Sequence, residues 1–381
     1  MGTSLRTLPK LQLTHLVAVT TVAVVALCLR AAGALLDHSG ARLAGDVLIV
    51  FGLLIPSLSI MRRFKDHDPL PPSSFLRSRI AIVLADVGWT VLCISAVQLA
   101  TSAPVGATWR SAFFDPLIAG SGLQTLCIAS SVISLSLIVY AIEAVLSCYR
   151  SRSACHDSLY RTALMAQAVL TCLCAPVLLL VSLLALGERV LHLGILSTES
   201  TLTTQLGWIA LHPLLLSALL PILGQTLDSF GVTAFLSKRL ARLALWSFAL
   251  LSILSYGQNA FDAGLSELHA ILASFYAALT CAPLLTLFAI GCEAAVRALG
   301  RRKWPLKQYL SVLCLVGCAA FLPLALSAAL PPLSLGFDIV LFGSHGRTVL
   351  LGLVLLGLAL SVLSIRTDST DSAEQAVRAS K

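Results

Sequence analysis

The chain has 381 residues, of which 57% are hydrophobic and only 12% charged, and its mean hydropathy is +0.92. This composition excludes a soluble enzyme, a secreted domain and a disordered chain, and it indicates an integral membrane protein. The apolar stretches are also too long for the short alternating strands of an outer-membrane barrel. The sequence therefore predicts an all-α polytopic bundle of transmembrane helices.

About ten apolar stretches of roughly the 20 residues that a membrane-spanning helix needs follow one another along the chain. Short polar connections separate them, so residues 11–365 are predicted to form a single transmembrane bundle between a tail at 1–10 and a polar tail at 366–381. The predicted spans are 11–30, 45–61, 80–103, 117–148, 163–186, 207–227, 243–261, 268–298, 308–334 and 347–365.

The net charge of +8 does not indicate a nucleic-acid partner, because the Lys and Arg residues are spread between the spans. Most of the 26 basic residues fall on one side of the bundle when both termini are placed inside, as the positive-inside rule requires. The basic residues left on the outer side are Arg30, Arg42, Arg110, Arg189 and Arg347. We therefore expect both tails to lie on the inner side of the membrane.

Cysteines and other small residues inside the spans favour close helix packing. The eleven cysteines show no CxxC spacing and mostly lie within spans, which is typical of buried small apolar residues rather than of a disulfide framework. Cys314 and Cys318 share one helix face. Small-residue runs such as Ala129-Ser130-Ser131 and Gly317-Cys318-Ala319-Ala320 suit helix–helix contacts in a membrane.

Polar residues within the spans are the candidate functional residues, because each is costly in hydrocarbon. His212 precedes Pro213 in the sixth span and is either a metal or haem ligand or a histidine bonded to an adjacent helix. Asp86 is a candidate for an interhelical contact or a proton-carrying group. Glu143 and Glu293 lie toward inner span ends, where we expect them to reach lipid headgroups or to pair with Arg150 or Arg297. A role in a proton relay is the alternative.

The sixth span also carries a motif of Trp, His-Pro, Leu-Pro and Gly at fixed spacing. Trp208 precedes His212-Pro213 by four residues, and Leu220-Pro221 and Gly224 follow. Other segments match in order: Pro176-Val177-Leu178, Glu188-Arg189, Phe261, Gly264, Pro283 and Asp338-Ile339-Val340-Leu341, with Arg30 at the end of the first span. In these features, from residue 11 to about 355, the chain resembles subunit I of the haem–copper oxidases, the family of cytochrome c oxidase. The resemblance implies the arrangement of the first ten helices of that subunit.

The resemblance also shows what this chain lacks, since the family binds two haems and a copper through six histidines. Only His212, at a copper-ligand position, is kept. The other ligand positions correspond to Gly45, Gln258, Asn259, Leu350 and Gly352. Proton-delivery and outer metal-site positions correspond to Leu214, Leu216, Leu287 and Phe342-Gly343. Gln258 and Asn259 are poor copper ligands but can form hydrogen bonds inside the bundle.

The sequence thus leads to one main hypothesis and two alternatives. We expect a non-catalytic structural or assembly subunit of a respiratory membrane complex, without a cofactor, in contact with the lipid bilayer and other membrane subunits. One alternative is a redox subunit that retains haem or copper on His212. The other is a transporter or channel built on the bundle that the lost cofactors leave, although the buried charges that would mark a path are few: Asp86, Glu143 and Glu293. Independently of these hypotheses, the polar intramembrane candidates are Asp86, Trp208, Gln258, Asn259 and Asp338. The resemblance implies a bacterial cytoplasmic membrane or a mitochondrial inner membrane.

Overall fold

The computed structural model describes most of the predicted bundle. The described residues are 8–52, 72–102, 120–150, 158–192, 201–232, 235–254, 267–299, 306–329, 351–357 and 359. They are almost wholly helical, and no strand occurs among them. The helices are α1 (Leu8–Leu35), α2 (Ser39–Gly52), α4 (Pro72–Ser102), α6 (Ser121–Arg150), α7 (Leu159–Leu191), α8 (Thr201–Ser217), α9 (Leu219–Phe230), α10 (Phe235–Leu254), α11 (Glu267–Leu299) and α12 (Leu306–Ala329).

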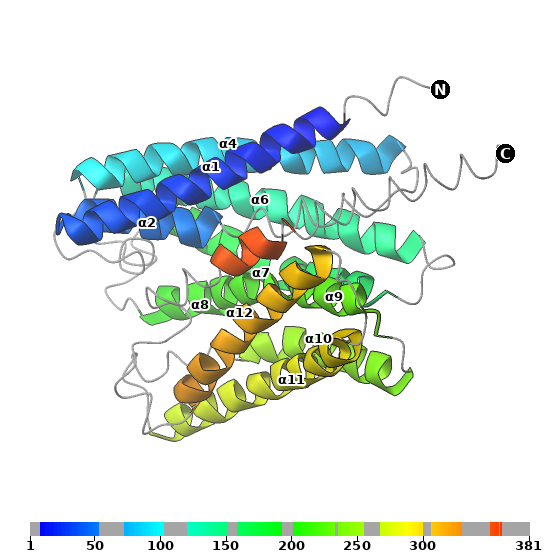
Figure 1. The fold of residues 1–381 in the computed structure, drawn as a ribbon. Coiled ribbons are helices and arrows are strands. Elements are labelled where there is room, and N and C mark those ends of the chain that lie inside the picture. Colours follow the sequence, from blue (N-terminus) through cyan, green and yellow to red (C-terminus); the bar gives the residue numbers. More distant parts are fainter. Residues whose placement is uncertain are drawn as a thin grey trace.

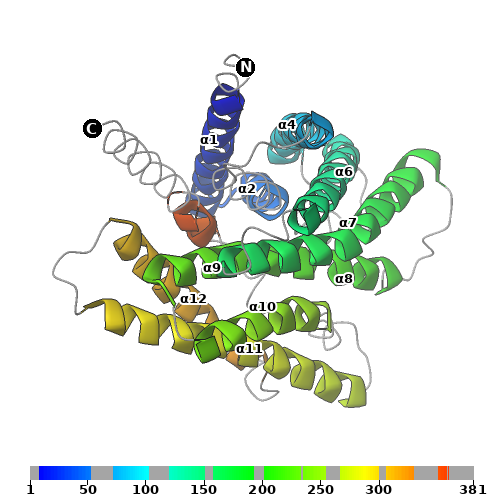
Figure 2. The same cartoon turned by 90° about the vertical axis from the view of Figure 1, so that its right-hand side faces the viewer.

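The helices form three layers, which can be followed in both views of the molecule (Figures 1 and 2). The first layer holds α1, α2, α4 and α6, the middle layer α7, α8 and α9, and the third α10, α11 and α12. Helices that follow one another in the chain mostly pack side by side, and α9 additionally contacts α7, α11 and α12. The α8–α9 pair therefore lies between the other two layers.

Five helical segments in the described part of the chain are long and apolar enough to cross a membrane. They are Arg79–Ser102, Ser121–Tyr149, Leu159–Leu191, Ile209–Phe230 and Cys281–Ala298. The described residues of all ten predicted spans are helical except Gly120 and Ala218, and the last span is described only at 351–357 and 359. The all-helical fold with several membrane-length helices is thus confirmed, whereas the number of spans and the side on which the termini lie stay predictions.

The outer faces of the bundle are apolar, as a bilayer requires. On α4 the exposed side chains Val83, Val87, Ile94 and Val97 recur at helical spacing, and Val97 is 66% exposed. A contiguous apolar face of this kind is a liability in water but matches lipid chains. These faces therefore indicate contact with the bilayer.

The Ile209–Phe230 segment differs from the other membrane helices because it is hidden from lipid. Its most apolar stretch is 94% buried, against 44–56% for the other four segments. The helix is broken at Ala218, between α8 and α9. Pro221 has no backbone N–H, so it cannot donate the usual helical hydrogen bond to the carbonyl of Ser217. The Ala218 N–H donates to the carbonyl three residues back, that of Leu215, at 3.2 Å, as in a tighter helical turn.

Candidate functional site

His212 lies in α8, six residues before the break at Ala218. Its side chain is 1% exposed, and the residues around it along the helix, Leu211, Leu214 and Leu215, are buried too. Among the described residues no group of three or more His, Cys, Asp or Glu side chains is placed to hold a metal ion.

Gly45, which the resemblance places at a haem-ligand position, lies in a close contact between α1 and α2. A Cβ atom added to Gly45 would lie 2.9 Å from the carbonyl oxygen of Ala26 and 2.9 Å from both the nitrogen and the Cβ of Arg30. Even a methyl group does not fit without a shift of the helices. A larger side chain at this position would therefore require α1 and α2 to move apart.

The remaining predicted positions divide into buried apolar residues and residues outside the described part. Leu214, Leu216 and Leu287 are at most 4% exposed, so no proton-carrying group replaces the ones that the family has there. Trp208 lies in α8, but its side chain is outside the description. The predictions that fall outside the described residues are Gln258, Asn259, Asp338, Phe342-Gly343 and Leu350. Of the predicted intramembrane candidates, the structure thus describes the side chains of His212 and Asp86 alone.

Asp86 is half-buried on α4, where its backbone carbonyl accepts a hydrogen bond of 2.8 Å from Thr90 Oγ1. Two residues further along, Gly88 packs against Ile133 of α6, to whose Cγ1 an added Cβ would approach within 2.8 Å. Asp86 thus lies beside a tight interface between two helices. Both of its predicted roles, an interhelical contact and a proton-carrying group, stay open.

An ion pair between α4 and α6 is a polar cluster that the sequence did not predict. Arg77 Nε donates to Glu143 Oε2 at 2.6 Å, and Ser147 Oγ donates to Glu143 Oε1 at 2.9 Å. The Glu143 side chain is 1% exposed and that of Arg77 31%. Glu143 was expected to reach lipid headgroups or to pair with Arg150 of its own helix, but its partner is Arg77 of α4. Glu293, as expected, pairs with Arg297 one turn further along α11.

A second polar cluster joins the start of α7 to the end of α9. The carboxylate of Asp228 accepts hydrogen bonds from the Leu159 and Tyr160 N–H groups, both at 3.0 Å, and from Ser158 Oγ at 2.6 Å. These N–H groups have no partner within their own helix, so a side chain from another helix caps α7. The same two helices touch at Gly224, whose added Cβ would lie 2.7 Å from Ala163 Cβ.

Polar contacts elsewhere in the first two layers also join helices. Ser130 and Ser182 share a hydrogen bond of 2.8 Å between α6 and α7, and Ser136 Oγ donates to the Ala81 carbonyl of α4 at 2.7 Å. At the other end of α7, Arg189 is 7% exposed and its Nη1 lies 2.8 Å from Cys127 Sγ. The close packing predicted for Ala129-Ser130-Ser131 is confirmed, since all three residues are buried. All of these contacts stabilise helix packing.

Comparison with known proteins adds no name to these features. No family model matches the chain, and no curated protein matches it. The resemblance to oxidase subunit I thus remains a prediction that rests on the sequence motifs.

Proposed function

We propose that the protein is a non-catalytic membrane subunit that acts by helix packing, as a structural or assembly component of a respiratory membrane complex. In this proposal it is a relative of haem–copper oxidase subunit I that has lost the redox centres and kept the bundle. Its membrane is then the bacterial cytoplasmic membrane or the mitochondrial inner membrane.

The observation that carries the proposal is the contact at Gly45. In the family that the chain resembles, the position of Gly45 presents a histidine to a haem. Here α1 packs against Gly45 so closely that an added Cβ would lie 2.9 Å from backbone atoms of α1. Buried Leu214, Leu216 and Leu287 agree with this, because they fill volume without offering a ligand or a proton. The polar contacts that remain join helices to one another, which is what a packing subunit needs.

The experiment that tests the proposal is a deletion of the chain, followed by native gels and mass spectrometry of the respiratory complexes in its own membrane. We expect one complex to lose abundance, and we expect the tagged chain to co-purify with the subunits of that complex in stoichiometric amount. His212→Leu should restore the complex as well as the unchanged chain does. A complex that assembles normally without the chain, or that is rescued only when His212 is intact, would contradict the proposal.

A transporter is the second candidate, and the break between α8 and α9 favours it. Discontinuous helices in the middle of a bundle form the substrate sites of many transporters. Gln167 of α7 is fully buried, and neither its Nε2 nor its Oε1 has a hydrogen-bond partner among the described residues. Asp228 contacts Leu159 and Gly224 contacts Ala163, so α7 and α9 run in opposite directions. Gln167 lies one turn beyond Ala163 on the same face of α7, which places it at the level of the break.

A flux assay separates this candidate from the first. The chain is reconstituted alone in liposomes that contain a pH-sensitive dye, and proton flux is measured under an imposed gradient. A proton transporter would give a proton flux that falls when Gln167 is changed to Leu but not when the buried Thr171 is changed to Val. The packing subunit that we propose gives no flux above that of empty liposomes.

A further inference from the structure

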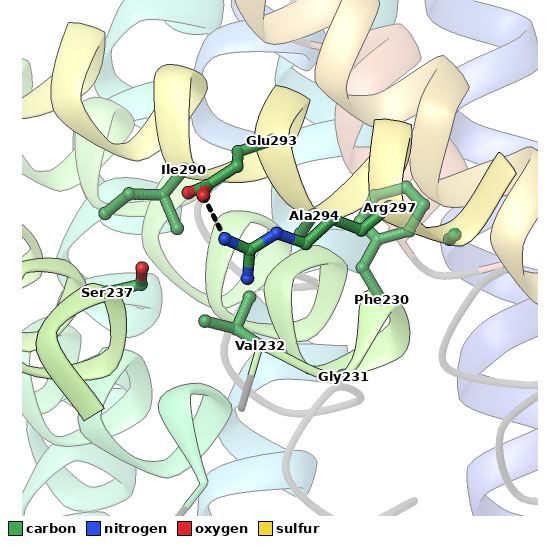
Figure 3. A pocket seen from close by; sticks show the side chains of 9 residues that line it. Phe230, Gly231, Val232, Ser237, Ile290, Glu293, Ala294 and Arg297 are labelled. Atoms are coloured by element: carbon green, nitrogen blue, oxygen red, sulfur yellow. Dashed lines mark hydrogen bonds and ion pairs between the residues drawn. The ribbon is translucent and has the colours of Figure 1, made fainter. Parts of the chain in front are cut away.

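A small cavity lies where the end of α9, the first turn of α10 and the last turns of α11 meet. It encloses about 160 Å³, enough for a polar group the size of several water molecules. Figure 3 shows the Arg297 guanidinium extending over the cavity beside Glu293, with Ser237 and Val232 on the opposite side. The walls therefore combine one positive charge, one negative charge and a hydroxyl with apolar side chains.

The two charged side chains of the cavity can each bind a further group. Arg297 Nη2 contacts Glu293 Oε1, and the side chains are 63% and 48% exposed. A guanidinium has five N–H donors and a carboxylate two oxygens, so this one contact leaves donors for an anion and an acceptor for a cation. The arrangement is complementary to a zwitterion whose anion and ammonium are joined by a short linker.

The position of the cavity is that of a lipid headgroup. The basic residues Lys238, Arg239 and Arg242 follow on α10, and their charge predicts that this end of the bundle lies at the inner surface of the membrane. Leu236 of α10 and Val296 of α11 are 67% and 65% exposed and directly precede the lining residues Ser237 and Arg297 in the chain. Exposed apolar side chains next to a charged cavity suit a molecule with a charged head and apolar chains.

We propose that this cavity binds the headgroup of a phosphatidylethanolamine, with the phosphate on Arg297, the ammonium on Glu293 and the acyl chains along Leu236 and Val296. A phosphatidylglycerol has no cation for Glu293 and meets a repulsive carboxylate there. A phosphatidylcholine has no N–H group to donate to that carboxylate, and its three methyl groups enlarge the head. The cavity thus selects a primary ammonium.

Native mass spectrometry of the full-length chain released from nanodiscs tests the proposal. The nanodiscs contain phosphatidylcholine with equal amounts of phosphatidylethanolamine and phosphatidylglycerol. We expect retained phosphatidylethanolamine to fall about tenfold in Arg297→Gln and in Glu293→Gln, as the loss of one charge-assisted hydrogen bond implies. Phosphatidylglycerol should not fall in Glu293→Gln. The matched control is Arg42→Gln, which removes another exposed, ion-paired arginine and should change nothing.

Two further measurements keep the proposal falsifiable. Ala294→Phe fills the cavity while both charges remain, and it should release phosphatidylethanolamine as fully as the charge variants do. Free phosphoethanolamine should not displace the lipid at equal concentration, because it lacks the acyl chains. The proposal is overturned if phosphatidylglycerol is retained equally well and falls with Arg297→Gln alone, if Arg42→Gln has the same effect as Arg297→Gln, or if free phosphoethanolamine competes at equal concentration.

Discussion

The region around His212 differs from the contacts that join α4 to α6 and α7 to α9 in how its polar groups are arranged. His212 of α8 lies among buried leucines, and the described residues hold no cluster of metal-ligating side chains. At the two helix contacts, Glu143 is held by Arg77 and Ser147, and Asp228 by Ser158 and two backbone N–H groups. The costly polar groups of the bundle are thus used where helices are joined.

This difference teaches that catalysis and helix packing make different demands on the polar groups of a membrane bundle. A catalytic centre needs several polar donors converging on one point in the middle of the membrane. Helix packing needs only pairs of groups that satisfy each other, together with small residues that let backbones approach. The described part of this chain has the second kind of feature in several places.

The largest expected effect is on the ion pair between α4 and α6. Arg77→Leu leaves the Glu143 carboxylate, 1% exposed, without its cation, and we expect a loss of about 3–5 kcal/mol in the free energy of unfolding. Unfolding in a mixed detergent series measures it. The double variant Arg77→Leu with Glu143→Leu should recover much of the loss, because no buried charge is left. Equal losses in the single and double variants would show that packing, and not charge, is responsible.

A smaller effect is expected at the close contact between Gly45 of α2 and α1. Gly45→Ala places a methyl group 2.9 Å from the backbone of α1, and overpacking of this kind costs about 1–3 kcal/mol. Gly52→Ala in the same helix is the matched control, since its Cβ would meet the Trp89 ring at an ordinary 3.4 Å. Thermal denaturation followed by circular dichroism compares the two. If Gly45→Ala is as stable as Gly52→Ala, α1 and α2 are not in close contact.

The cap on α7 is expected to contribute somewhat less. Asp228→Ala removes the acceptor of three hydrogen bonds and should cost about 1–2 kcal/mol. Asp228→Asn keeps one oxygen and should lose less than Asp228→Ala. Hydrogen exchange of the first turn of α7 is the direct measurement, and faster exchange confined to residues 159–162 is the expected pattern. Unchanged exchange there in Asp228→Ala would contradict the capping role.

The smallest effect is expected at an exposed pair. Asp37 and Arg42 approach to 3.5 Å, but their side chains are 96% and 51% exposed, so solvent screens the attraction. Asp37→Asn should leave the thermal midpoint unchanged within error. A clearly lower thermal midpoint would mean that the stability contributed by an ion pair in this bundle does not depend on how far the pair is buried.

The sequence predicted those features that depend on local pattern. Apolar runs of membrane length located the helices, and the i, i+4 spacing of Glu293 and Arg297 on one helix face indicated their pair. The burial of Ala129-Ser130-Ser131 followed from residue size. For each of these, the information lies within one helix.

Features that join distant segments could not be predicted in the same way. Arg77 and Glu143 are 66 residues apart, and Ser158 and Asp228 are 70 residues apart, so only the packing of the helices brings them together. From the sequence, Arg77 was assigned only to the basic residues on the inner side of the membrane, and no motif or spacing indicated a role for Asp228. The cavity at Glu293 and Arg297 likewise needs three helices, although its ion pair comes from one.

A reduced-minus-oxidised optical spectrum of the detergent-purified chain, with metal analysis of the same sample, is the most direct test of the central claim that the bundle acts without a redox centre. We expect no stoichiometric haem or copper, and no difference between the unchanged chain and His212→Ala. A stoichiometric haem or copper signal that disappears in His212→Ala would contradict the non-catalytic function and would identify His212 as the ligand of a retained redox centre.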